Sequence, residues 1–160
     1  MIRAYVALGA NLGAAAATVS AAAAALAGIP ETRLVVVSSL YQTAPVGLKH
    51  QPDFINAVSA VDTTLTAEVL LEALFALEAR FGRSRSVPNA PRTLDLDLLL
   101  YGETRLDEPR LTLPHPRMHQ RAFVLAPLAE IAPECLIPGR GSVRELLEAC
   151  RDQRLVRLGS

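Results

Sequence analysis

The sequence predicts one α+β domain, in which helices pack on an antiparallel sheet. The chain has 160 residues, a length that suits a single domain with a substantial core. Segments of strand and helical character follow in the order strand, helix, strand, strand, helix, strand and then a helical tail. No linker and no repeat divides the chain, so we treat residues 1–160 as one domain.

The first part of the chain supplies three strands and one helix. Residues 2–8 alternate around apolar side chains and predict a strand, and residues 9–13 contain glycines that favour a turn. Residues 14–27 are rich in alanine, the best helix former, and predict a helix. Residues 33–43 predict one long strand, and residues 54–63 predict another strand that runs antiparallel to it.

The second part begins with a helix over residues 67–80, for which Thr66 is the expected cap. A loop then leads into a leucine-rich strand that ends at Tyr101. The last two helices are predicted over residues 122–131 and 142–151. This order of elements is that of the split βαβ, ferredoxin-like fold with a helical C-terminal part.

Composition narrows the classes of function. Of the residues, 51% are apolar and 20% are charged, as in an ordinary soluble protein. The net charge is zero, which argues against a general polyanion binder. There is no apolar run long enough for a membrane span and no signal-peptide pattern, so we expect a cytoplasmic protein. Cys135 and Cys150 are interpreted as reduced, with a disulfide between them as the alternative.

The most informative stretch is Pro91–Tyr101, where leucines flank and separate Asp95 and Asp97. Side chains alternate along a strand, so both carboxylates point to the same side, with Cα atoms roughly 7 Å apart. Two like charges beside a core need a positive partner. Oxygen ligands favour a hard cation such as Mg²⁺, which also binds substrate phosphates. The alternative is a pair of surface carboxylates that pair with Arg92 or another arginine; the leucines and the preceding arginines favour the metal site.

Residues Ala90–Leu99 closely resemble the signature of the 6-hydroxymethyl-7,8-dihydropterin pyrophosphokinase family of folate synthesis. Four other segments match this family in order and spacing: Ala7–Gly13, Ser38–Pro45, Gln51–Ala57 and Leu113–Met118. The resemblance covers nearly the whole chain and implies the same α+β fold. It also implies an enzyme that uses Mg²⁺, as two ions, and transfers pyrophosphate from ATP to the hydroxymethyl group of the pterin, with release of AMP.

The resemblance assigns several residues to the phosphates of ATP. Arg83 and Arg92 match residues that hold and activate the transferring phosphates, and arginine forks suit phosphate oxygens. His115, between two prolines that stiffen the backbone, matches a contact to the nucleotide phosphates. Taken alone, each of these would more simply be a solvated loop arginine or a structural histidine. Further contacts to the nucleotide are expected from Arg85, Arg110, Thr112, Arg121 and Glu78, the last with a helix-surface position as its alternative.

A pterin site requires flat apolar walls and a few paired polar groups. Asn56 offers the donors and the acceptor that the aminopyrimidinone edge of a pterin needs. Phe54 and Phe123 can stack on the ring, although ordinary core packing is the alternative for either residue alone. The residues that match the family's pterin slot are Thr43, Pro45, Val46, Phe54, Asn56 and Phe123.

The segment 82–92 departs from the family in places. Many relatives carry a tryptophan where Asn89 stands and a basic residue where Pro88 stands, and Pro116 replaces an aromatic residue. The segment holds three arginines and two prolines and has no apolar period. We therefore predict a lid over residues 82–91 that orders only when ATP and the pterin are both bound.

Two other functions stay open at this point. A ferredoxin-like fold also serves nucleic-acid binding, but that use requires exposed aromatic residues on the sheet and a basic face, which this sequence does not provide. A metal-dependent phosphohydrolase could use the same pair of aspartates, and its product from ATP would be ADP and phosphate. We expect ATP and a dihydropterin as ligands, neither nucleic acid nor membrane as a partner, and a monomer.

Overall fold

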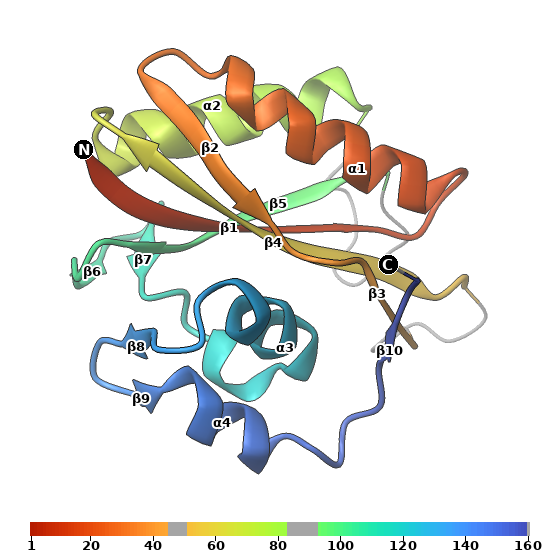
Figure 1. Cartoon of the computed structure of the whole chain (residues 1–160). Coiled ribbons are helices and arrows are strands. Elements are labelled where there is room, and N and C mark those ends of the chain that lie inside the picture. The colour runs from red at the N-terminus through yellow and green to blue at the C-terminus, as the bar shows by residue number, and fades with distance from the viewer. Residues whose placement is uncertain (45–50, 83–92, 160) are drawn as a thin grey trace.

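The computed structural model describes residues 1–44, 51–82 and 93–159 of the chain. Its centre is a six-stranded antiparallel sheet that lies between two layers of helices (Figure 1). The helices α1 and α2 cover one face of the sheet, and α3 and α4 cover the other face. This arrangement confirms the α+β class that the order of elements predicted.

The strand order in the main sheet is β10-β3-β4-β1-β5, and β2 also pairs with β4. Every pair in this sheet is antiparallel, as predicted for the strand over residues 54–63. The strands are β1 (Ile2–Ala10), β2 (Thr32–Val37), β3 (Tyr41–Thr43), β4 (Phe54–Thr63), β5 (Asp95–Tyr101) and β10 (Val156–Arg157).

The helices follow the predicted positions closely. Thr66 caps α2, because its Oγ accepts a hydrogen bond from Val69 N at 3.2 Å. The helices are α1 (Ala15–Ala25), α2 (Ala67–Arg80), α3 (Ala122–Ile131) and α4 (Val143–Ala149), with short 3₁₀ turns at Leu26–Gly28 and Met118–Gln120. Two small hairpins complete the fold: β6 (Leu106–Asp107) with β7 (Thr112–Leu113), and β8 (Leu136–Ile137) with β9 (Gly141–Ser142).

The structure corrects the strand predicted over residues 33–43, which is divided into β2 and β3. The division lies at Ser38, which leaves the regular ladder. Its N–H donates to Val58 O at 2.9 Å, and its Oγ accepts from Val58 N at 3.0 Å. The hydroxyl takes the place of a backbone carbonyl, so the chain bends without leaving a buried donor unpaired.

The turn predicted over residues 9–13 also begins later than expected. Gly9 and Ala10 continue β1, because they pair with Asn56 and Ile55 of β4. Pairing across the sheet therefore outweighs the local preference of glycine for a turn.

The core forms on both faces of the sheet. Toward α1 and α2, Val6 and Leu8 of β1 and Leu96 and Leu98 of β5 are almost fully buried. Toward α3 and α4, a second cluster contains Val58 and other apolar residues of the opposite sheet face. Among the described helices, none is long and apolar enough to cross a membrane.

The two cysteines are free, in accord with their interpretation as reduced residues. Cys135 is half-buried and Cys150 is buried. Burial raises the pKa of both thiols, so each behaves as a small apolar residue rather than as a reactive thiolate.

Candidate active site

Polar side chains gather at one end of the sheet, on the face that α3 and α4 cover. In the register, Gly9 of β1 lies between Asn56 of β4 and Asp95 of β5, and Ala7 lies opposite Asp97. Residues opposite one another share a face, and Ala7 packs into the α3/α4 core. The three strands therefore bring the amide and both carboxylates to the same face.

The absence of a side chain at Gly9 keeps this part of the face open. A Cβ atom added at Gly9 would lie 3.1 Å from Asn56 Oδ1, which is tighter than ordinary contact. A larger residue would push the amide of Asn56 aside or fill the space between it and Asp95. This requirement for space, rather than a turn, explains the glycine at this position.

Asp95 and Asp97 are half-buried, and the leucines between and beside them are buried. The first part of the strand thus presents its carboxylates to one side and Leu96 and Leu98 to the other, as the sequence predicted. Within the described residues, no group of three His, Cys, Asp or Glu side chains could hold a metal ion. A pair of carboxylates does fit Mg²⁺, which takes one or two protein carboxylates and completes its shell with waters and substrate phosphates.

Glu78 of α2 holds the backbone of β5 between the two aspartates. Its Oε2 accepts a hydrogen bond from Leu96 N at 2.7 Å, and the residue is only 2% exposed. Because β5 ends the strand order, this N–H faces the open edge of the sheet and needs a partner other than a strand. The helix-surface alternative for Glu78 was wrong, and a contact of this residue with the nucleotide stays a prediction.

His115 lies beside β5 with a defined ring orientation. The backbone N–H of His115 donates to Leu99 O at 2.9 Å, and the ring atom Nδ1 accepts from the backbone N–H of Arg117 at 3.1 Å. Burial, followed by the positive charges of Arg121 and Arg117, lowers the pKa of His115 to about 4, although Asp95 acts in the opposite direction. The ring is therefore neutral at pH 7 and carries its proton on Nε2, which can donate to an anion.

The other predicted nucleotide contacts are distributed around this region. Thr112 and His115 line one cleft of about 600 Å³, between the β6–β7 and β8–β9 hairpins. Arg121 is the N-cap residue that precedes α3, and its guanidinium lies 5.5 Å from the ring centroid of Phe123. Arg110 differs from these residues, because its side chain is exposed and forms an ion pair with Glu72 of α2 at 2.6 Å.

The predicted pterin residues on β3 and β4 lie together. Asn56 is 6% exposed and donates from Nδ2 to Thr43 Oγ1 at 3.0 Å. Thr43 lies opposite Phe54 in the register, so these side chains share the α3/α4 face with Asn56. Phe123 is at the start of α3, the helix that covers this face (Figure 1).

A family model also matches this chain, over residues 5–133. It describes 7,8-dihydro-6-hydroxymethylpterin-pyrophosphokinase, abbreviated HPPK. The chain belongs to the HPPK family. This finding confirms the family that the aspartate strand and the four other segments indicated.

Two curated HPPK relatives match this chain over nearly their whole length. The 2-amino-4-hydroxy-6-hydroxymethyldihydropteridine pyrophosphokinase of Pseudomonas aeruginosa is 50% identical over 156 residues, which cover 98% of this chain and 96% of that protein. The enzyme of the same name from Haemophilus influenzae is 41% identical over 158 residues, or 99% of each chain. Pyrophosphokinase activity with ATP as co-substrate is thus the activity of the family.

Solved HPPK structures share the fold. An HPPK-DHPS in complex with substrates superposes with a TM-score of 0.76 at 12% identity, and covers 99% of this chain but 47% of its own. The Plasmodium falciparum HPPK-DHPS A437G with STZ-DHP gives a TM-score of 0.73 at 13% identity, covering 92% of this chain and 45% of its own. This chain therefore spans about half the length of those two, and the likeness shows the ferredoxin-like fold alone.

Part of the predicted HPPK site lies outside the described residues. This applies to two pterin contacts, to three arginines and to the predicted lid apart from Gly82. The residues concerned are Pro45, Val46, Arg83, Arg85 and Arg92.

The structure adds one polar contact that sequence reasoning missed. Asn11 is 2% exposed, and its Nδ2 donates to Gln51 Oε1 at 2.7 Å and to Pro52 O at 3.0 Å. This amide ties the end of β1 to the segment before β4, at the end of the sheet where Asn56 lies. Asn11 and Gln51 both belong to segments that resemble the HPPK family, which is the signal that could have paired them.

Proposed function

We propose that this chain uses the α3/α4 face of its sheet to transfer pyrophosphate from ATP to 6-hydroxymethyl-7,8-dihydropterin, in a Mg²⁺-dependent step of folate biosynthesis. The observation that carries the proposal is the common face of Asp95, Asp97 and Asn56 on three neighbouring strands. It supports a site where a metal-bound triphosphate and a flat amide-like heterocycle meet.

In the proposed reaction, the hydroxymethyl oxygen of the pterin attacks the β-phosphorus of ATP. The bond from that phosphorus to the oxygen bridging to the α-phosphate breaks, AMP leaves and the hydroxyl proton is released. Mg²⁺ held by Asp95 and Asp97, as two ions, would neutralise charge on the phosphate oxygens.

The protein groups divide the remaining tasks between them. The neutral ring of His115 donates from Nε2 to a phosphate oxygen, a role that its bond from Arg117 N supports. Arg121 and the loop arginines Arg83 and Arg92 add positive charge where the transferring group passes. Asn56, oriented by Thr43, pairs with the pyrimidinone edge of the pterin.

Product analysis tests this proposal. The full chain is incubated with ATP, Mg²⁺ and the dihydropterin, and the products are identified by mass. We expect AMP and the pterin diphosphate in equal amounts, and neither without Mg²⁺. ADP with inorganic phosphate would instead indicate the phosphohydrolase that the aspartate pair alone allows. A substrate-dependent release of ADP and pterin monophosphate would also overturn the proposed reaction.

A further inference from the structure

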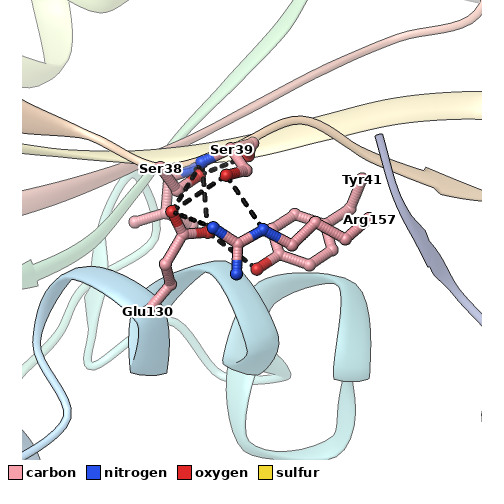
Figure 2. A network of polar contacts seen from close by, with 6 residues as sticks. Ser38, Ser39, Tyr41, Glu130 and Arg157 are labelled. Atoms are coloured by element: carbon pink, nitrogen blue, oxygen red, sulfur yellow. Dashed lines mark hydrogen bonds and ion pairs between the residues drawn. The ribbon is translucent and has the colours of Figure 1, made fainter. Parts of the chain in front are cut away.

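A polar network joins the end of α3 to β3, and its centre is Glu130 (Figure 2). Glu130 Oε1 and Oε2 accept from Ser39 N at 3.1 and 3.0 Å, and Oε2 also accepts from Ser39 Oγ at 3.0 Å. Tyr41 Oη donates to Oε1 at 2.7 Å. Arg157 adds an ion pair, with Nη2 3.4 Å from Oε2. One carboxylate thus gathers donors from Ser39 in the connection between β2 and β3, from Tyr41 of β3 and from Arg157 of β10.

The C-terminal strand β10 holds this arrangement from the other side of β3. Arg157 lies opposite Tyr41 in the register, and its Nε donates to Ser39 Oγ at 3.0 Å. Leu158 N donates to Leu40 O at 2.8 Å. The strand β3 has only three residues, so its own ladder with β4 is short and these added bonds matter for its position.

Both elements that Glu130 joins carry proposed pterin residues. On β3, Tyr41 lies opposite Asn56, and Thr43 accepts the hydrogen bond that orients the Asn56 amide. On α3, Phe123 precedes Glu130 by seven residues, which places the two side chains on nearly the same face of the helix, roughly 10 Å apart along its axis. Glu130 binds β3 from one face of α3, and Phe123 lies on nearly the same face of this helix.

We infer that Glu130 is a positioning residue for the pterin site, since it fixes the spacing between the amide wall of Asn56 and the aromatic wall of Phe123. The inference rests on the proposed function, because it names what sets the width of that same site. Glu130 itself is separated from Asn56 by Tyr41, so its effect passes through β3 and α3 rather than through contact with the ligand.

The electrostatics of the network support a fixed geometry at neutral pH. Burial alone would raise the pKa of Glu130, but the hydrogen bonds from Tyr41 and Ser39 and the charge of Arg157 lower it. Burial, followed by the bond to Glu130, raises the pKa of Tyr41 to about 12. The carboxylate is thus an acceptor and the phenol a donor at neutral pH, and charge-assisted bonds of this kind are the stronger ones.

The test compares pterin affinity with nucleotide affinity in the full chain. Glu130→Ala should raise the Kd for 6-hydroxymethyldihydropterin about tenfold, measured by calorimetry with a non-hydrolysable ATP analogue and Mg²⁺ present. The Kd for the ATP analogue should stay within about twofold. The pterin KM should rise while kcat at saturating pterin falls less. If the network only stabilises the fold, Glu130→Ala would lower the midpoint of unfolding and leave the ratio of the pterin Kd to the nucleotide Kd unchanged.

A matched control is available just beyond the same helix. Glu134 pairs with Arg144 at 3.5 Å, and its side chain is 85% exposed. Glu134→Ala should leave both affinities and the unfolding midpoint near those of the wild type. If Glu130→Ala shifts the pterin Kd no more than Glu134→Ala does, the inference is wrong.

Tyr41→Phe provides a second route if Glu130→Ala does not fold. It keeps the ring and removes only the bond to Glu130. We expect a two- to fivefold rise in pterin Kd. When Glu130→Gln is combined with it, the total rise should be smaller than the product of the two single rises, because both changes weaken the bond between Tyr41 and Glu130. Independent, additive effects on pterin Kd would overturn the link through Tyr41. A wild-type chain that binds no dihydropterin would refute the proposed function instead, whatever the variants do.

Discussion

The two faces of the sheet are built from the same strands but have different roles. The α1/α2 face is mainly aliphatic, with Val6, Leu8, Leu96 and Leu98 in one cluster, although the buried Ser59 and Thr63 of β4 also lie on it. The α3/α4 face has an apolar part under its helices and a polar end where Asp95 and its neighbours lie. In the first four residues of β5, half-buried aspartates alternate with buried leucines. The comparison shows that a packed face holds the strands rigid, which positions the carboxylates on the reverse face.

Glu78 is the charged residue of α2 that connects the two faces. It comes from α2, on the apolar side, yet its carboxylate reaches the edge of β5 and binds the N–H of Leu96. A buried acidic side chain is costly unless it is hydrogen-bonded, so its presence inside the aliphatic core indicates a specific need for β5 to be held there. The faces are therefore distinct in composition but mechanically coupled.

The largest effect should come from the polar face. Asp97→Asn removes one charged oxygen ligand, and we expect kcat to fall about a thousandfold, or ~4 kcal/mol, while pterin affinity stays nearly constant. Steady-state kinetics and calorimetry with the pterin measure the two. Asp152→Asn, at an exposed position, is the control. Retention of more than about a tenth of the wild-type kcat would mean that Asp97 does not hold the metal.

A substitution on the apolar face should change stability more than kcat. Leu74 is fully buried between α2 and the sheet, and Leu74→Ala should lower the free energy of unfolding by about 3 kcal/mol through lost burial and a cavity. The kcat of the molecules that remain folded should change less than threefold at a temperature well below the unfolding midpoint. Urea unfolding and kinetics test the pair of expectations. A loss of kcat without a loss of stability would show that the apolar face has a direct part in catalysis.

Substitution of a loop arginine should lower the rate less than substitution of Asp97 does. Arg92→Ala should lower the single-turnover rate by roughly thirtyfold, or about 2 kcal/mol, and weaken nucleotide binding less, because the guanidinium is expected to act mostly on the transition state. Nucleotide Kd and single-turnover rate are measured together. A large change in Kd with an unchanged rate would assign Arg92 to docking alone.

A further effect concerns the pH dependence of stability, through His115. Its pKa of about 4 in the folded state lies below the unfolded value of 6.5. Between these values the unfolded chain binds more protons, so stability falls as the pH drops from 6.5 toward 4 and levels off below that. His115→Asn should remove this part of the fall. Urea midpoints of both proteins at pH 7, 5.5 and 4.5 test this, and parallel curves would show that His115 does not titrate as described.

The sequence predicted best where one local pattern decides the structure. Alternation of leucine and aspartate indicated both the strand and the face of its carboxylates. Ser38 could not be foreseen as a break, because its hydroxyl replaces a backbone acceptor only once Val58 lies beside it. Glu130 was missed for a related reason: its bond to Ser39 spans 91 positions of sequence, and no local pattern marks such a pair. For Glu78, a helix-surface position was the alternative to a nucleotide contact, and its bond to Leu96 N was not foreseen because an acidic residue in a core has no hydropathy signal.

The most direct test locates the metal in a crystal of the full chain with Mn²⁺, a non-hydrolysable ATP analogue and the dihydropterin. Anomalous scattering from Mn²⁺ marks the ion without reference to any assumed site. The account predicts peaks about 2.1 Å from carboxylate oxygens of Asp95 and Asp97, with the pterin edge against Asn56 on the same sheet face. A metal peak away from both aspartates, or a pterin bound on another face, would contradict it.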